Sequence, residues 1–129
     1  MRKWMMVSLM VFTVTLLGAC QSNAVETIDA DRAIELMEEN SEIILLDVRE
    51  YSEYVTERID GSELLPLSIL ESSIENVYPD KTTPFIVYCR SGNRSAEAVS
   101  IMTELGYENI YDLGGILDWP YETVSGAPS

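Results

Sequence analysis

Short apolar segments that alternate with amphipathic ones are the feature that most limits how this chain can fold. Residues 43–46 (Ile-Ile-Leu-Leu) and 85–88 (Phe-Ile-Val-Tyr) are apolar throughout, which is typical of strands buried on both faces. Apolar residues at helical spacing in residues 30–37, 69–77 and 98–105 predict helices before, between and after these strands. Because strands and helices alternate, we expect an α/β fold with about five mostly parallel strands and helices on both faces of the sheet.

Smaller elements follow from capping and turn-forming residues. Asp29 is placed to cap the first helix, and Gly106 to end the last long helix in a left-handed conformation. The other expected elements are a short helix at residues 51–57, strands at 63–65 and 110–113, and a turn or helix at 114–119. A chain of 129 residues has room for one ordinary domain, which we place at residues 26–129.

The composition excludes several classes of function. The chain carries 22 acidic and 8 basic residues, and such a surface repels the phosphate backbone of nucleic acids. It also disfavours electrostatic binding to anionic lipids. There is no histidine, which excludes Ser-His-Asp and Cys-His hydrolases and argues against a zinc site. We therefore expect no metal, no cofactor, and a nucleophile that ionises without a histidine.

The first twenty residues have the pattern of an export signal. Arg2 and Lys3 precede a largely apolar stretch at residues 5–17, which is too short to span a bilayer. Residues 17–20 read Leu-Gly-Ala-Cys, and small residues directly before a cysteine resemble a bacterial lipoprotein signal. That resemblance implies removal of residues 1–19, lipidation of Cys20, a tether at residues 20–25 and an extracytoplasmic location on the cell envelope. An uncleaved anchor and an ordinary signal peptide are the alternatives.

Lipidation of Cys20 would determine which cysteine remains as a free thiol. If Cys20 carries lipid, Cys89 is the free thiol of the mature chain, and a free thiol outside the cytoplasm is open to oxidation. Loss of Arg2 and Lys3 also leaves six basic residues, for a net charge of −16. Contact with the membrane is then expected through the lipid alone.

Cys89 opens a polar segment, Cys-Arg-Ser-Gly-Asn-Arg-Ser at residues 89–95, that links a predicted buried strand to a predicted helix near Ser95. Ligands of open α/β sheets bind at the carboxyl ends of strands. A tight loop of small residues can point its N–H groups inward, and the helix start adds its positive end. With Arg90 and Arg94 nearby, these surroundings favour the thiolate over the thiol.

This segment resembles the active-site loop of rhodanese-type sulfurtransferases. The resemblance extends to residues 46–50, 53–54, 59–62 and 113–119, in the order of the family and over nearly all of the mature chain. A difference lies at residues 57–58, which are Glu-Arg where many members have Gly-His.

The resemblance implies that the Cys89 thiolate takes sulfur from thiosulfate or a similar anionic donor and holds it as a persulfide. An external thiol or a cyanide-like acceptor then removes the sulfur. The expected substrate-binding residues are Arg90, Ser91, Gly92, Asn93, Arg94 and Ser95. Arg90 would face the substrate and Arg94 would brace the loop. Asp47 and Arg49, at the neighbouring strand end, are expected to form a salt bridge of the scaffold.

Two other functions stay open at this point. One is a cysteine-based phosphatase or arsenate reductase of the same fold. The related phosphatases use a seven-residue loop, whereas residues 89–94 form one of six. The other is a module that binds or senses sulfane sulfur without turnover, although such a module has less need to keep Cys89.

Overall fold

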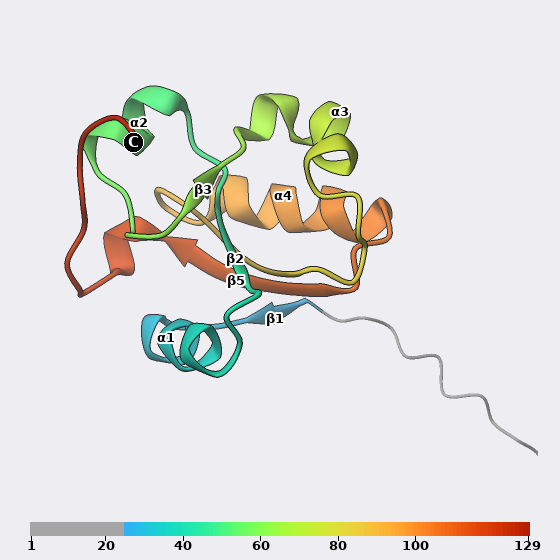
Figure 1. Ribbon diagram of the computed structural model, residues 1–129, viewed down its shortest axis with the longest axis horizontal. Coiled ribbons are helices and arrows are strands. Elements are labelled where there is room, and N and C mark those ends of the chain that lie inside the picture. The colour runs from blue at the N-terminus through green and yellow to red at the C-terminus, as the bar shows by residue number, and fades with distance from the viewer. Residues whose placement is uncertain (1–24) are drawn as a thin grey trace, which may run out of the picture.

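A computed structural model describes residues 25–129 as one five-stranded parallel sheet with helices on both faces (Figure 1). The strands are β1 (Glu26–Thr27), β2 (Ile44–Asp47), β3 (Glu63–Leu64), β4 (Pro84–Cys89) and β5 (Asn109–Gly115), and their order is β1-β5-β4-β2-β3. The helices are α1 (Ala30–Glu39), α2 (Tyr51–Thr56), α3 (Leu67–Val77) and α4 (Asn93–Glu104), followed by a 3₁₀ helix, η1 (Ile116–Asp118). The predicted α/β class and sheet are confirmed.

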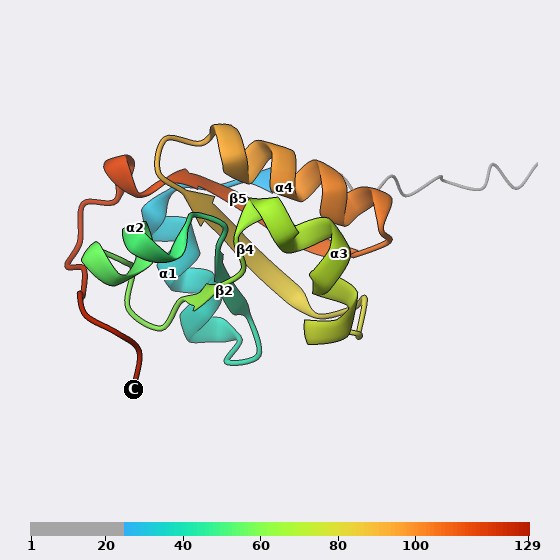
Figure 2. The ribbon, with the colours of Figure 1, turned by 90° about the horizontal axis from the view of Figure 1, so that it is seen from above.

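The two faces of the sheet bury alternate residues of the central strand β4. Phe85, Val87 and Cys89 belong to the apolar cluster that α3 and α4 cover. Ile86 and Tyr88 belong to a second cluster on the opposite face, which α1 covers. Figure 1 shows α1 on one side of the sheet and α3 and α4 on the other, and Figure 2 shows the latter two from above. Residues 85–88 are all buried, as their apolar run predicted, and so is Cys89.

Most predicted boundaries hold within two or three residues, with informative differences. The Asp29 side chain accepts from the Arg32 N–H at 2.9 Å, and Gly106 has the expected positive φ of 94°. By contrast, α4 begins at Asn93 rather than near Ser95. Asn93 and Arg94, which were expected in the loop, therefore lie in the first turn of α4. The sequence patterns did not identify β1, because two exposed polar residues at a sheet edge show no hydrophobic periodicity.

The segment after η1 pairs with the chain beyond α2. Arg58 and Val124 form an antiparallel bridge, with reciprocal N–H to carbonyl distances of 2.9 Å. The Gly126 N–H also donates to the Val55 carbonyl at 2.7 Å. Arg58, at the point where the sequence departs from the rhodanese pattern, thus holds the chain end against α2.

The predicted signal, the lipidated Cys20 and nearly all of the tether lie outside the described residues. Within residues 25–129, no helix is long and apolar enough to cross a bilayer.

Candidate active site

Cys89 is the last residue of the buried strand β4, and its side chain lies at the carboxyl end of the sheet. The residue is 1% exposed. The Gly92 N–H donates to Cys89 Sγ at 3.0 Å. Gly92 can face the sulfur because it adopts a left-handed conformation, with φ of 104°, that L side chains rarely adopt. A backbone donor held at this distance stabilises negative charge on sulfur.

The loop after Cys89 is fixed from two sides. The buried Ser95 hydroxyl donates to the Gly92 carbonyl at 3.0 Å, which joins the turn to the start of α4. On the other side, the Leu117 N–H donates to the Arg90 carbonyl at 3.2 Å. Gly115 lies so close that a Cβ there would stand 2.3 Å from the same carbonyl oxygen. The end of β5 and η1 therefore determine where the loop lies.

Arg94 is bound to α2 rather than directed at the loop. Its Nη1 and Nη2 donate to the two carboxylate oxygens of Glu53 at 2.7 and 2.8 Å. Glu53 also accepts from the Glu50 N–H at 3.0 Å as part of a capping box. The Arg94 hydrogen bonds lower the pKa of Glu53 to about 2, with a further contribution from the Glu50 N–H. These contacts join the first turn of α4 to α2.

Asp47 and Arg49 form the expected ion pair, and both side chains are buried. Arg49 Nη2 lies 2.7 Å from Asp47 Oδ2, with side-chain exposures of 4% and 0%. Arg49 Nη2 also donates to the Glu57 carbonyl at 2.6 Å, which ties the end of α2 to the sheet. The guanidinium lies 5.6 Å from the centre of the Tyr88 ring. Burial raises the pKa of Tyr88, with the Asp47 charge adding to it, and the phenol stays neutral while donating to Ser62 Oγ at 3.0 Å.

Arg90 differs from every other basic side chain in residues 25–129. Four of these side chains form ion pairs: Arg32 with Glu35, Arg49 with Asp47, Lys81 with Glu75 and Arg94 with Glu53. A fifth, Arg58, donates to the carbonyls of Tyr54 and Gly126. Arg90 is exposed, and within the described residues its guanidinium has no hydrogen-bond or ion-pair partner. A free arginine beside Cys89 is available to an anion.

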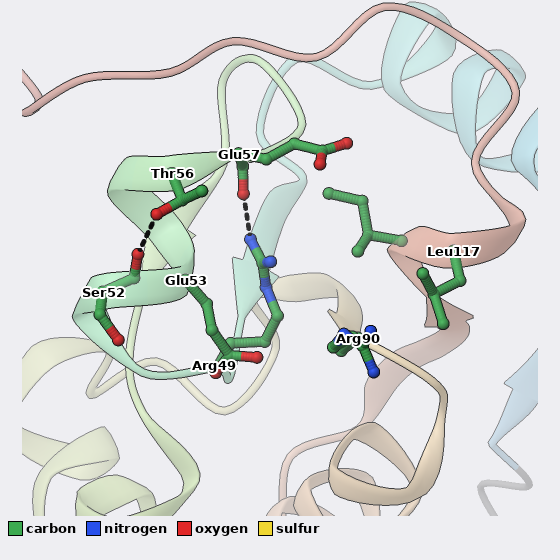
Figure 3. A pocket seen from close by; sticks show the side chains of 8 residues that line it. Arg49, Ser52, Glu53, Thr56, Glu57, Arg90 and Leu117 are labelled. Carbon is green, nitrogen blue, oxygen red and sulfur yellow. Dashed lines mark hydrogen bonds between the residues drawn. The ribbon is translucent and has the colours of Figure 1, made fainter.

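An open cavity of about 430 Å³ lies between α2, the loop and η1 (Figure 3). Its lining residues are Arg49, Ser52, Glu53, Thr56, Glu57, Arg90, Ile116 and Leu117. Cys89 is 1% exposed and is absent from this lining, whereas the adjacent Arg90 is part of it. Within residues 25–129, no cluster of three or more carboxylate or thiol groups could hold a metal ion.

The predicted binding and supporting residues thus separate into four groups. Gly92 and Ser95 shape the turn around the sulfur, and Arg90 faces the cavity. Ser91 and Asn93 are exposed at the turn and the start of α4. Arg94, Asp47 and Arg49 support α2 and the sheet end.

Sequence reasoning missed the contributions of Glu53, Glu57, Gly115 and Leu117. The consecutive glycines at the end of β5 were the available signal for one of them. Glycine in a strand often marks a close approach of another backbone segment.

Fold and site together define a class: a parallel α/β protein with a buried thiol in a loop between a strand end and a helix. The sequence pattern of the family described as "Rhodanese-like domain" matches residues 29–121. The chain is 33% identical over 81 residues to "Thiosulfate sulfurtransferase PspE" of Escherichia coli, an alignment that covers 63% of this chain and 78% of that protein. It is 38% identical over 91 residues to "Uncharacterized protein slr1261" of Synechocystis, where the alignment covers 70% of this chain and half of that protein.

Solved structures agree with the sequence comparison. A structure described as "rhodanese with anions from E. coli" superposes with a TM-score of 0.60 at 32% identity, covering 65% of this chain and 99% of that one. A rhodanese-related protein from Thermoplasma volcanium gives 0.66 at 30% identity, covering 77% and 97%. The chain belongs to the rhodanese-like family. At the level of that family it is a sulfurtransferase, an enzyme of rhodanese type.

Proposed function

We propose that this chain moves sulfane sulfur from thiosulfate or a similar anionic donor to a thiophilic acceptor through a persulfide on Cys89. The observation that carries the proposal is that the hydrogen-bonded sulfur of Cys89 is followed by an arginine without a partner in the described residues. Cys89 Sγ accepts the Gly92 N–H at 3.0 Å, while the neighbouring Arg90 guanidinium has no partner in residues 25–129. A sulfur that accepts a backbone hydrogen bond is thus adjacent in the chain to an arginine without a partner in the described residues.

In the proposed first half-reaction, the Cys89 thiolate attacks the outer sulfur of thiosulfate. A new S–S bond forms at Cys89, the S–S bond of thiosulfate breaks, and sulfite leaves with the electron pair. Arg90 binds the sulfonate oxygens before the attack and sulfite afterwards, because a guanidinium forms charge-assisted hydrogen bonds with oxyanions. In the second half-reaction the acceptor removes the outer sulfur and restores the thiolate.

The excess of acidic residues makes the unpaired state of Arg90 informative. The chain has 22 carboxylates and 8 basic residues, so an arginine without a functional use has many possible partners. One relative is named a thiosulfate sulfurtransferase, which supports the choice of donor. Another, from Allochromatium vinosum, is named a sulfurtransferase, which supports the class of reaction.

Mass spectrometry of the intact protein tests the proposal directly. After incubation with thiosulfate we expect a gain of one sulfur atom on Cys89, its removal by cyanide with formation of thiocyanate, and neither event in Cys89→Ser. Absence of the adduct with thiosulfate and with other sulfane donors would overturn the proposal. Hydrolysis of an aryl phosphate that disappears in Cys89→Ser would instead assign the site to phosphoryl chemistry.

We also propose that Cys20 is lipidated and anchors the domain to the outside of a bacterial cytoplasmic membrane or to an outer membrane. The support is the sequence pattern of residues 1–20, which lie outside the described part of the chain. Metabolic labelling with radioactive palmitate should mark the wild-type protein but not Cys20→Ser. Equal labelling of both would refute the anchor without bearing on the sulfur chemistry.

A further inference from the structure

The cavity beside the loop is larger than a small anionic donor requires. Pockets of roughly 300–1,000 Å³ bind drug-sized ligands. The cavity of about 430 Å³ falls in this range, whereas thiosulfate has five heavy atoms. Because the loop with Arg90 forms only one side of this space, the remaining walls have room to select a second, larger substrate.

Four charged side chains line the cavity, but two of them are already neutralised. The Arg49 charge is balanced by Asp47 at 2.7 Å, and the Glu53 carboxylate by both terminal nitrogens of Arg94. Arg90 and Glu57 have exposed side chains with no ion-pair partner in residues 25–129. The uncompensated charges of the cavity are therefore one cation at the loop and one anion at the end of α2.

The position of Glu57 is not explained by the stability of the helix. Glu57 is the C-terminal cap of α2, where the backbone carbonyls carry partial negative charge and a carboxylate is unfavourable. Its backbone is fixed, since its N–H donates to the Glu53 carbonyl at 3.0 Å and its own carbonyl accepts from Arg49 Nη2 at 2.6 Å. The carboxylate has no partner within residues 25–129, and Figure 3 shows it apart from Arg90.

The wall opposite α2 is apolar. Ile116 and Leu117 of η1 face the cavity, and Leu117 is 63% exposed although it is a large aliphatic residue. An aliphatic stem lying against this wall would bury part of its surface. The cavity thus offers a site for an anionic sulfur near Arg90, an apolar surface for a short stem, and a carboxylate for a cationic group.

We infer that the sulfur acceptor is a small aminothiol, whose protonated amine is bound by Glu57 while its sulfur approaches Cys89 past Arg90. The inference rests on the proposed function. In the transfer, the acceptor thiolate attacks the outer persulfide sulfur, a new S–S bond forms in the acceptor, and the S–S bond to Cys89 breaks. Cys89 leaves as the thiolate, and the proton lost by the acceptor thiol passes to the solvent. No external oxidant or reductant is consumed.

Three acceptors with the same two-carbon stem test this assignment: 2-aminoethanethiol, which is cationic, 2-mercaptoethanol, which is neutral, and 3-mercaptopropionate, which is anionic. The kcat/KM for each is measured at saturating thiosulfate in the wild type and in Glu57→Gln. Because each thiol is compared with itself in the two proteins, differences in intrinsic reactivity cancel. We expect Glu57→Gln to lower kcat/KM about three- to fivefold for the cationic thiol, as for loss of an exposed ion pair, and to leave the neutral thiol unchanged.

Glu71→Gln is the matched control, because it removes the same charge from an exposed position on α3 outside the cavity lining. It should leave all three acceptors unchanged. An equal loss for the cationic thiol in both variants would show that overall charge is responsible and would overturn the inference, as would an unchanged preference in Glu57→Gln. Mass spectrometry separates the two proposals. If the Cys89 persulfide forms but Glu57→Gln does not selectively slow its transfer to the cationic thiol, only the aminothiol assignment is refuted. If no persulfide forms, both proposals are refuted.

Discussion

Charged side chains gather near the carboxyl end of the sheet in two groups that differ in their partners. In the first group, Asp47 is paired with Arg49 and Glu53 with Arg94, and each pair includes two or more hydrogen bonds. In the second, Arg90 and Glu57 have no charged partner in residues 25–129. The first group connects β2, α2 and α4, whereas the second faces a cavity.

A charged side chain near the thiol does not necessarily bind substrate. Arg90 and Arg94 lie in the same short segment and have the same chemistry, and the sequence places both beside Cys89. In the structure Arg94 pairs with Glu53, whereas Arg90 has no ion-pair partner within residues 25–129. We therefore expect changes in the paired group to affect folding first, and changes in the unpaired group to affect substrate binding first.

The largest effect on stability is expected at Asp47. Asp47→Asn should lower the free energy of unfolding by about 3–5 kcal/mol, because the Arg49 guanidinium is left buried without its counter-charge. Urea unfolding provides the measurement, with Glu57→Gln as the unpaired counterpart, which should change stability by less than about 0.5 kcal/mol. The double variant Asp47→Asn/Arg49→Met should recover part of the loss. A double variant less stable than Asp47→Asn would contradict this account of the pair.

The next effect concerns the position of the free arginine. Gly115→Ala should lower kcat/KM for thiosulfate by about 100-fold, because its Cβ would stand 2.3 Å from the Arg90 carbonyl and must displace the loop. Gly115 has an ordinary φ of −104°, so the contact alone causes the expected loss. The control for backbone strain is Gly106→Ala, since Gly106 has a positive φ of 94° but a Cβ there meets no atom within 4 Å. It should lose stability and keep its activity below the melting temperature. Equal activity losses in the two variants would indicate general strain instead.

Replacement of Arg90 should weaken substrate binding, whereas replacement of Arg94 should lower stability. Arg90→Ala should raise the KM for thiosulfate about tenfold through loss of a charge-assisted contact, with unfolding changed by less than about 0.5 kcal/mol. Arg94→Ala should instead cost about 1–3 kcal/mol of stability, because the partly buried Glu53 loses its partner. Steady-state kinetics and urea unfolding of both variants provide the comparison. A stability loss in Arg90→Ala as large as that in Arg94→Ala would remove the distinction.

The sequence predicted those parts of the molecule that local patterns determine. The apolar runs in β2 and β4, the Asp29 cap and the turn at Gly106 all depend on neighbouring residues. The loop with Cys89 was located for the same reason, since it lies between a recognisable strand and helix. These features account for the fold class and for the position of the thiol.

Pairings between distant residues could not be predicted in this way. Glu53 and Arg94 are 41 residues apart, and with 22 carboxylates in the chain no local pattern singles out the partner of an arginine. The contact between Gly115 and the Arg90 carbonyl likewise depends on how β5 packs beside β4. The functional difference between Arg90 and Arg94 is therefore a property of the tertiary structure.

The smallest expected effect is a loss of stability at acidic pH. It tests the pair of Glu53 and Arg94. The pKa of Glu53 is lowered from 4.5 to about 2 by the Arg94 hydrogen bonds. The folded state therefore binds the Glu53 proton more weakly than the unfolded state does. The resulting stabilisation is complete above pH 4.5 and is lost as the pH falls towards 2. After allowance for solvent screening, its size is about 1–2 kcal/mol.

Glu53→Gln removes this contribution, so the stability difference between wild type and Glu53→Gln should shrink as the pH falls from about 5 to about 2.5. Urea unfolding at several pH values measures it, and the other carboxylates cancel because both proteins contain them. Glu57→Gln, which alters an unpaired carboxylate, should show no comparable convergence with the wild type. Convergence in Glu57→Gln but not in Glu53→Gln would reverse the division between paired and unpaired groups, and would mean that Arg94 is the arginine available to substrate.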